Sequence, residues 1–72
     1  MVFQFKVSLT YDQFFEFYSG AVQRIQVTDT KRRVLHIHAR HFRSYITRQG
    51  IDGFFEMKLN SNGELQYLTK LL

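Results

Sequence analysis

The chain has 72 residues, a formal net charge of +4 and neither cysteine nor proline. This length fits one domain, residues 1–72, and the lack of cysteine excludes disulfides as a source of stability. Eight phenylalanines and four tyrosines offer dense aromatic packing instead. Because no segment has the apolar length of a membrane span and the alternating start is unlike a signal peptide, we expect a cytoplasmic protein.

A strand followed by a short helix is predicted at the start of the chain. Residues 2–9 alternate apolar and polar side chains, which is typical of a half-buried strand. Thr10 with Gln13 is a capping-box signature, and it predicts a helix that ends at Gly20. The residues expected to face the core from this helix have i, i+3, i+4, i+7 spacing and are Tyr11, Phe14, Phe15 and Tyr18.

Two hairpins are predicted in the remainder of the chain. Residues 21–29 and 32–38 form the first, joined by the polar link Asp29-Thr30-Lys31. Residues 39–45 break the alternation and predict a tight turn or a single helical turn. Residues 53–60 and 64–71 form the second hairpin around Asn60-Ser61-Asn62-Gly63. In its last strand we expect Leu65, Tyr67 and Thr69 to share a face.

These elements predict an α+β fold with a small, mainly antiparallel sheet of about five strands and one short helix after the first strand. With so few residues, the sheet is expected to curl into a half-open barrel that buries its aromatic face. The helix would then cover one side of the sheet or plug one end.

Four short motifs, taken in order, carry a resemblance to a known family. They are Tyr18-Ser19-Gly20, the run Arg33-Val34-Leu35-His36-Ile37, the set Ala39, Arg43, Ile46 and Thr47, and the set Gly50, Ile51, Gly53 and Phe55. With these motifs the chain resembles DUF2835, a bacterial family of unknown function. His38 and Ser44 stand where that family has prolines, so we expect a less rigid turn here. The resemblance implies a fold and a bacterial, intracellular setting, and it implies no activity.

The segment from Lys31 to Arg48 concentrates the positive charge. It holds six of the ten Lys and Arg residues and no acidic residue, so it carries +6, whereas the other four basic and six acidic residues sum to −2. Cations on one face would attract phosphate backbones without sequence preference, although a solvated, solubilising face is the simpler interpretation. The candidate anion- or nucleic-acid-binding residues are Lys31, Arg32, Arg33, Arg40, Arg43, Arg48, His36, His38 and Tyr45. In this set the histidines would add charge in mild acid and Tyr45 would stack on a base.

Other kinds of site have weaker support. His36 and His38 share a strand face, and His41 or Asp52 could complete a metal site, but the surrounding arginines repel a cation, so we expect no metal and no cofactor. Arg40 and Arg43 are one residue too close for the arginine pair of cyclic-dinucleotide-binding PilZ domains. Because the sequence has no Cys nucleophile and no Gly-rich phosphate loop, we expect neither an enzyme nor a small-molecule substrate.

The sequence therefore favours a small non-catalytic binding module that presents a basic face to an anionic partner, with nucleic acid as the first choice. The alternative is a structural or interaction protein that forms a homodimer through its aromatic-rich sheet. In that case the basic segment would only solubilise the protein or dock an acidic one. The first hypothesis requires that the cations of residues 31–48 point the same way once the chain is folded.

Overall fold

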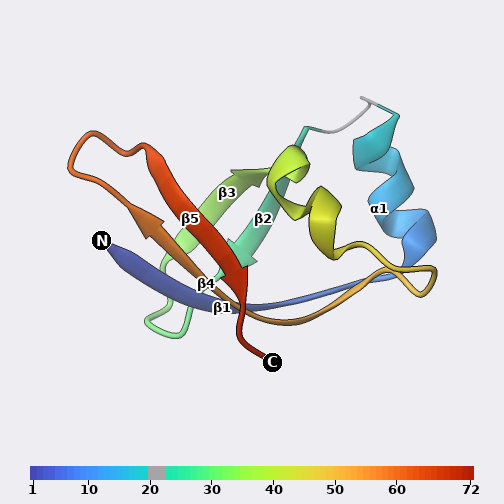
Figure 1. Ribbon diagram of the computed structural model, residues 1–72, viewed down its shortest axis with the longest axis horizontal. Helices are drawn as coiled ribbons and strands as arrows, with labels where there is room; N and C mark the ends of the chain where they lie inside the picture. Colours follow the sequence, from blue (N-terminus) through green and yellow to red (C-terminus); the bar gives the residue numbers. More distant parts are fainter. Residues whose placement is uncertain (20–22) are drawn as a thin grey trace.

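A computed structural model describes residues 1–19 and 23–72 of the chain (Figure 1). The described elements are β1 (Val2–Leu9), α1 (Tyr11–Tyr18), β2 (Arg24–Thr28), β3 (Val34–His38), the 3-10 helix η1 (Ala39–Tyr45), β4 (Ile51–Leu59) and β5 (Leu65–Lys70). Strands β1, β4 and β5 form one antiparallel sheet with β4 in the centre, and β2 and β3 form a second, two-stranded one. The α+β class and the five antiparallel strands are thus confirmed. Neither helix in this described part is long and apolar enough to cross a membrane.

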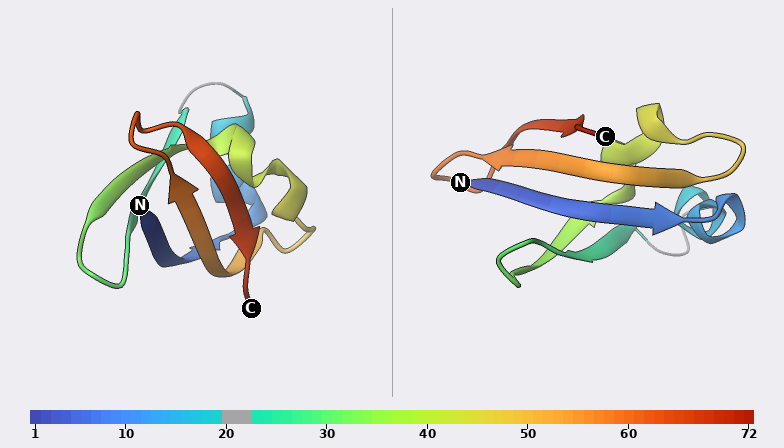
Figure 2. Two further views of the ribbon diagram at one scale, coloured as in Figure 1. Left: turned by 60° about the vertical axis from the view of Figure 1, so that its left-hand side comes forward. Right: turned by 90° about the horizontal axis from the view of Figure 1, so that it is seen from below.

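The prediction of one curled sheet is wrong, because the five strands divide into two sheets. In the described residues, the backbone links between the β2–β3 hairpin and β1 are an isolated bridge between Phe5 and Asp29 and a hydrogen bond from the Thr30 N–H to the Gln4 carbonyl. The β2–β3 hairpin crosses the longer sheet obliquely, so their backbones pair only at this corner, while their side chains pack together in the core (Figures 1 and 2). The strand order through this junction is β3-β2-β1-β4-β5, and the arrangement stays open between β3 and β5.

The core lies between the two sheets and is closed by η1. Phe5, Phe42, Phe55 and Ile51 are completely buried. The Phe42 ring stands edge-on to Phe5 and Phe55, with centroids 6.5 and 5.6 Å apart. The Tyr45 ring packs edge-on against Phe55 at 5.3 Å. The covering role expected of the lone helix is therefore filled by η1, which spans from β3 to β5 (Figure 2).

Helix α1 begins as predicted but faces the core differently. The Gln13 N–H donates to Thr10 Oγ1 at 3.2 Å and the Thr10 N–H donates to Gln13 Oε1 at 2.9 Å, which confirms the capping box. Phe14 is buried and Phe17 half-buried, whereas Tyr11 and Phe15 are 49% and 55% exposed. The predicted apolar stripe is thus wrong for Tyr11 and Phe15. The reason is that α1 lies at the end of the molecule, where only one narrow side meets the sheets (Figure 1).

Three predictions at the end of α1 fall outside the described residues. They are the orientation of the Tyr18 side chain, the role of Gly20 in ending the helix and the start of the second strand at residue 21. Two other predicted boundaries move by two residues. Arg32 lies in the turn before β3 with a positive φ of 64°, and β4 begins two residues earlier than predicted, at Ile51.

A bulge near the start of β5 places Leu65 on the opposite face from Tyr67. The pairing of β4 with β5 shifts between Lys58 and Leu59, so Leu65 pairs with Leu59 and Leu68 with Met57. Both leucines pack against the core, while Tyr67 lies on the outer face, where its hydroxyl donates to Glu56 Oε2 at 2.8 Å. The expectation that Tyr67 shares a face with Leu65 is therefore wrong, because the extra residue shifts the alternation by one position. The predicted Asn60–Gly63 turn is confirmed, with Gly63 at a φ of 79°.

The central position of Phe42 leads to a stability prediction. Phe42→Ala leaves a cavity between the sheets, so we expect the free energy of unfolding to fall by about 3–5 kcal/mol. The matched control is Phe15→Ala, which truncates an exposed ring and should change the stability by less than about 0.5–1 kcal/mol. Urea unfolding followed by circular dichroism measures both. Equal losses in the two variants would contradict the assignment of η1 as the cover of the core.

Candidate anion-binding surface

The exposed charged side chains of residues 23–50 are all positive. This stretch holds seven Lys and Arg residues and a single carboxylate, Asp29, so its net charge is +6. Asp29 is buried, which leaves no exposed carboxylate on β2, β3, η1 or the turns that follow β2 and η1. The remaining acidic residues lie on α1, on β4 and in the β4–β5 turn and are Asp12, Glu16, Asp52, Glu56 and Glu64.

The cations predicted to act together fall into two groups. Lys31 and Arg32 lie in the β2–β3 turn, whereas Arg40 and Arg43 lie on η1 and share a side of it, because a 3-10 helix has about three residues per turn. Arg48 lies further on, in the turn before β4. The two groups are separated by the length of β3, about 16 Å at ~3.3 Å per residue, and sit at opposite ends of the hairpin (Figure 1).

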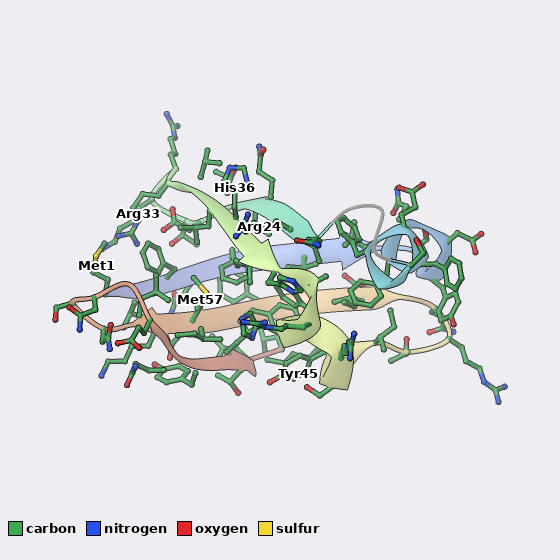
Figure 3. The ribbon with its side chains drawn as sticks, turned by 90° about the horizontal axis from the view of Figure 1, so that it is seen from above. Met1, Arg24, Arg33, His36, Tyr45 and Met57 are labelled. Carbon is green, nitrogen blue, oxygen red and sulfur yellow. The ribbon has the colours of Figure 1, made fainter. Side chains whose placement is uncertain are left out.

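The outward face of the β2–β3 hairpin connects the two groups. Arg24 pairs with His38 and Gln26 pairs with His36, and paired residues share a face of the sheet. Arg24 and His36 are exposed and project from the hairpin away from the three-stranded sheet (Figure 3). The resulting surface, which we call the basic strip, comprises Arg24, Lys31, Arg32, His36, His38 and Arg40. Arg24 was not among the predicted site residues, because its position beside His38 depends on the register of the hairpin.

Two of the predicted site residues, Arg33 and Tyr45, use their side chains to join distant segments of the fold. Arg33 Nε donates to Asp29 Oδ2 at 2.6 Å, and its Nη2 donates to the Val2 carbonyl at 3.2 Å. Its guanidinium also lies 4.2 Å from the centroid of the Phe3 ring. Tyr45 is half-buried, and its hydroxyl donates to the Leu68 carbonyl at 2.7 Å. Both side chains therefore link segments of the fold, and we leave them out of the basic strip.

The Asp29 carboxylate is the partner that holds Arg33 in place. Its side chain has no exposed area, and it accepts hydrogen bonds from the backbone N–H groups of Lys31 and Arg33 in addition to Arg33 Nε. Burial by itself would raise the pKa of Asp29. The hydrogen bonds from Arg33 and Lys31, together with the Arg33 charge, outweigh burial and lower the pKa below its ordinary value. Asp29 is therefore ionised at neutral pH and neutralises Arg33.

The histidines beside the strip differ in their surroundings. His38 Nδ1 accepts a hydrogen bond from the Arg40 N–H at 3.1 Å and so caps η1, and its ring centroid lies 6.4 Å from that of His41. Burial, the Arg40 charge and His38 lower the pKa of His41, so His41 is neutral at pH 7. Among the described residues, no three His, Cys, Asp or Glu side chains are arranged to hold a metal ion.

Comparison with known proteins places the chain in a family. The family model described as a protein of unknown function (DUF2835) matches residues 1–71. The chain belongs to DUF2835. The resemblance indicated by the sequence motifs is thereby confirmed. No curated protein and no solved structure matches this DUF2835 chain.

The lowered pKa of Asp29 predicts a specific loss of stability in acid. Because the pKa is lower in the folded than in the unfolded state, the ionised carboxylate stabilises the fold above the unfolded pKa of about 3.9, and this contribution is lost as the pH falls through the folded pKa. Asp29→Asn should lower the Tm at neutral pH and flatten its dependence on pH in the acid range. Thermal unfolding across that range measures both effects.

The control for this experiment is Asp52→Asn, which changes an exposed carboxylate. We expect its Tm to follow that of the wild type across the acid range. If the Tm of Asp29→Asn fell with pH as steeply as that of the wild type, other carboxylates would control acid unfolding.

Proposed function

We propose that this DUF2835 chain is a non-catalytic binding module whose basic strip contacts the phosphates of a nucleic acid without sequence preference. The observation that carries the proposal is the surface of β2, β3 and η1, which bears cations but no exposed carboxylate. An anion approaching this surface meets attraction along the whole hairpin, because the only carboxylate in residues 23–50 is buried and paired.

The dimensions and chemistry of the strip fit a short run of phosphates. Its length of about 16 Å spans roughly five nucleotides of one strand at ~3.4 Å each. Arg24 and Arg40 provide planar guanidinium groups that bind phosphate oxygens in pairs, and Gln26 and Thr28 add neutral donors on the same face. Because Tyr45 is held in the fold, no tyrosine or phenylalanine contributes base stacking from this strip. Binding would therefore depend mainly on charge.

A homodimer is the alternative, and one observation favours a particular face for it. The rings of Phe5, Phe42 and Phe55 are buried within a single chain and need no partner. Val2 and Tyr67 are instead exposed on the outer side of the three-stranded sheet, and this side could meet a second copy. Sedimentation at increasing protein concentration distinguishes the alternative, because a monomer at all concentrations would exclude it.

The proposed function predicts a characteristic salt dependence. Binding of short fluorescent single-stranded RNA and DNA should weaken as the salt concentration rises. A plot of the logarithm of the association constant against the logarithm of the salt concentration should have a slope of about −0.7 for each phosphate neutralised, and about −2 to −3 in total. Arg24→Gln/Arg32→Gln/Arg40→Gln removes three strip charges and should flatten this slope by about 2 and reduce affinity at low salt at least about tenfold. Fluorescence anisotropy at several salt concentrations measures both quantities.

The matched control removes the same charge elsewhere. Lys6→Gln/Lys58→Gln/Lys70→Gln takes three exposed cations from the three-stranded sheet, and we expect its salt slope to stay close to that of the wild type. Equal losses in the two triple variants would mean that net charge alone attracts the nucleic acid. No binding by the wild-type chain at low salt would overturn the proposal.

A further inference from the structure

A groove separates the two free edges of the sheets. It has a volume of about 200 Å³, and it lies between β3 and the β4–β5 hairpin. Leu35 and Ile37 line it from β3, and Met57, Leu59 and Leu65 line it from β4 and β5. Met57 is seen between β3 and the β4–β5 hairpin in Figure 3. The groove thus has an apolar floor and, on one side, the backbone of an edge strand.

The edge of β3 has backbone groups that no described strand pairs with. The Ala39 N–H donates to the Gln23 carbonyl, and the Asp29 N–H donates to the Arg33 carbonyl. Since residues of an antiparallel strand alternate in the direction of their backbone groups, odd-numbered residues of β3 point toward β2. The N–H groups of Val34, His36 and His38 and the carbonyl groups of Val34 and His36 therefore point away from β2, toward the groove side. The carbonyl of His38, the N-cap of η1, instead belongs to the first turn of that helix.

The edge of β5 is better protected than that of β3. Tyr45 already donates its hydroxyl to the Leu68 carbonyl of β5, and the bulge opposite Lys58 and Leu59 distorts the strand. Such bulges, together with lysine and proline, are the usual devices that keep an edge strand from pairing with another chain. Val34–His38 contains none of them, so β3 is the edge open to an added strand.

We propose that an extended acidic peptide segment pairs with the edge of β3 and lies in the groove between β3 and β5. The added strand would receive main-chain hydrogen bonds from β3, and every second side chain would rest on the floor formed by Met57 and Leu65. Its other side chains would emerge beside His36, His38 and Arg40, with no exposed carboxylate on β2, β3 or η1 to repel an acidic residue. Glu64, between the groove residues Gly63 and Leu65 in the sequence, is an exposed carboxylate, and it accepts a hydrogen bond from Asn60 Nδ2 at 3.1 Å.

The main-chain pairing at the edge of β3 is separate from the nucleic-acid contacts proposed above, although acidic side chains of the peptide would reach His36, His38 and Arg40 of the basic strip. A nucleic acid would bind the side chains on the outward face of the β2–β3 hairpin, whereas the peptide would bind the main chain of β3 at its edge. The inference therefore does not rest on the proposed function. Backbone amide protection separates the two, because phosphate contacts to side chains leave the edge amides exposed to water.

The experiment is amide hydrogen exchange of the full chain by NMR, with a short peptide of alternating valine and glutamate as the probe. In the free protein, the amides of His36 and His38 should exchange faster than those of Leu35 and Ile37, which point toward β2. The peptide should slow exchange of His36 and His38 at least about tenfold and leave Leu35 and Ile37 unchanged. No slowing at saturating peptide would overturn the proposal.

Two control peptides and one variant test the chemistry of the occupant. A peptide of alternating valine and lysine should give little protection, and a valine–glutamate peptide with a central proline should give less than the parent because it lacks a main-chain donor. Arg40→Glu, an exposed change on η1, should weaken the valine–glutamate peptide and strengthen the valine–lysine one. Equal protection by both charge patterns would overturn the acidic specificity. Protection that rises with protein concentration alone would show that a second copy occupies the edge.

Discussion

The ion pair between Asp29 and Arg33 is the interaction on which the arrangement of the two sheets depends. Asp29 accepts two backbone N–H groups and the Arg33 guanidinium, and this fixes the turn between β2 and β3. Arg33 then extends to β1, where it donates to the Val2 carbonyl and covers the Phe3 ring. The bridge between Asp29 and Phe5 lies at the same place. Burying the Asp29 carboxylate without these donors would cost free energy of folding. The β2–β3 turn and the contact between the hairpin and β1 therefore stabilise each other.

The same ion pair determines the charge of the surface. The only carboxylate of residues 23–50 is buried in this pair, and its charge is neutralised by Arg33. The other six cations of this stretch remain on or near a surface that has no exposed carboxylate. An exposed Asp29 in the turn would instead have neutralised Lys31 and Arg32 locally. The positive surface of the hairpin is therefore a consequence of how its turn is built. The Asp29–Arg33 ion pair both stabilises the fold and leaves the candidate site without an exposed carboxylate.

Local signals in the sequence predicted the local structure well. The alternation of residues 2–9, the Thr10–Gln13 capping box and the Asn60–Gly63 turn each involve neighbouring residues, and the structure confirms all three. The long-range features were not predictable in this way. The division into two sheets depends on the bridge between Phe5 and Asp29, which are 24 residues apart. The polar sequence around Asp29 also does not indicate that this residue is buried. The β5 bulge reversed a facing that alternation alone had fixed.

The candidate site was predicted in composition but not in geometry. Counting charges located the basic segment, but it could not show that Arg33 is held by Asp29 or that Tyr45 is held by Leu68. It also missed Arg24, which precedes the segment and joins it only through the register of β2 with β3. Pairing across a hairpin brings together residues that are distant in the sequence, so a surface of this kind emerges only once the register is known.

The open edge of β3 follows from the path of the chain after it. At Ala39 the chain leaves β3 as η1 and crosses to β5, where Tyr45 reaches the Leu68 carbonyl. Phe42 fills the space between the sheets on the way, so the core is complete without a further strand. Because η1 is only seven residues long, it closes the opening near the end of β3 and leaves the rest of that edge uncovered. The short η1 helix thus completes the core with the Phe42 ring. For the same reason it leaves a groove beside the unpaired edge of β3.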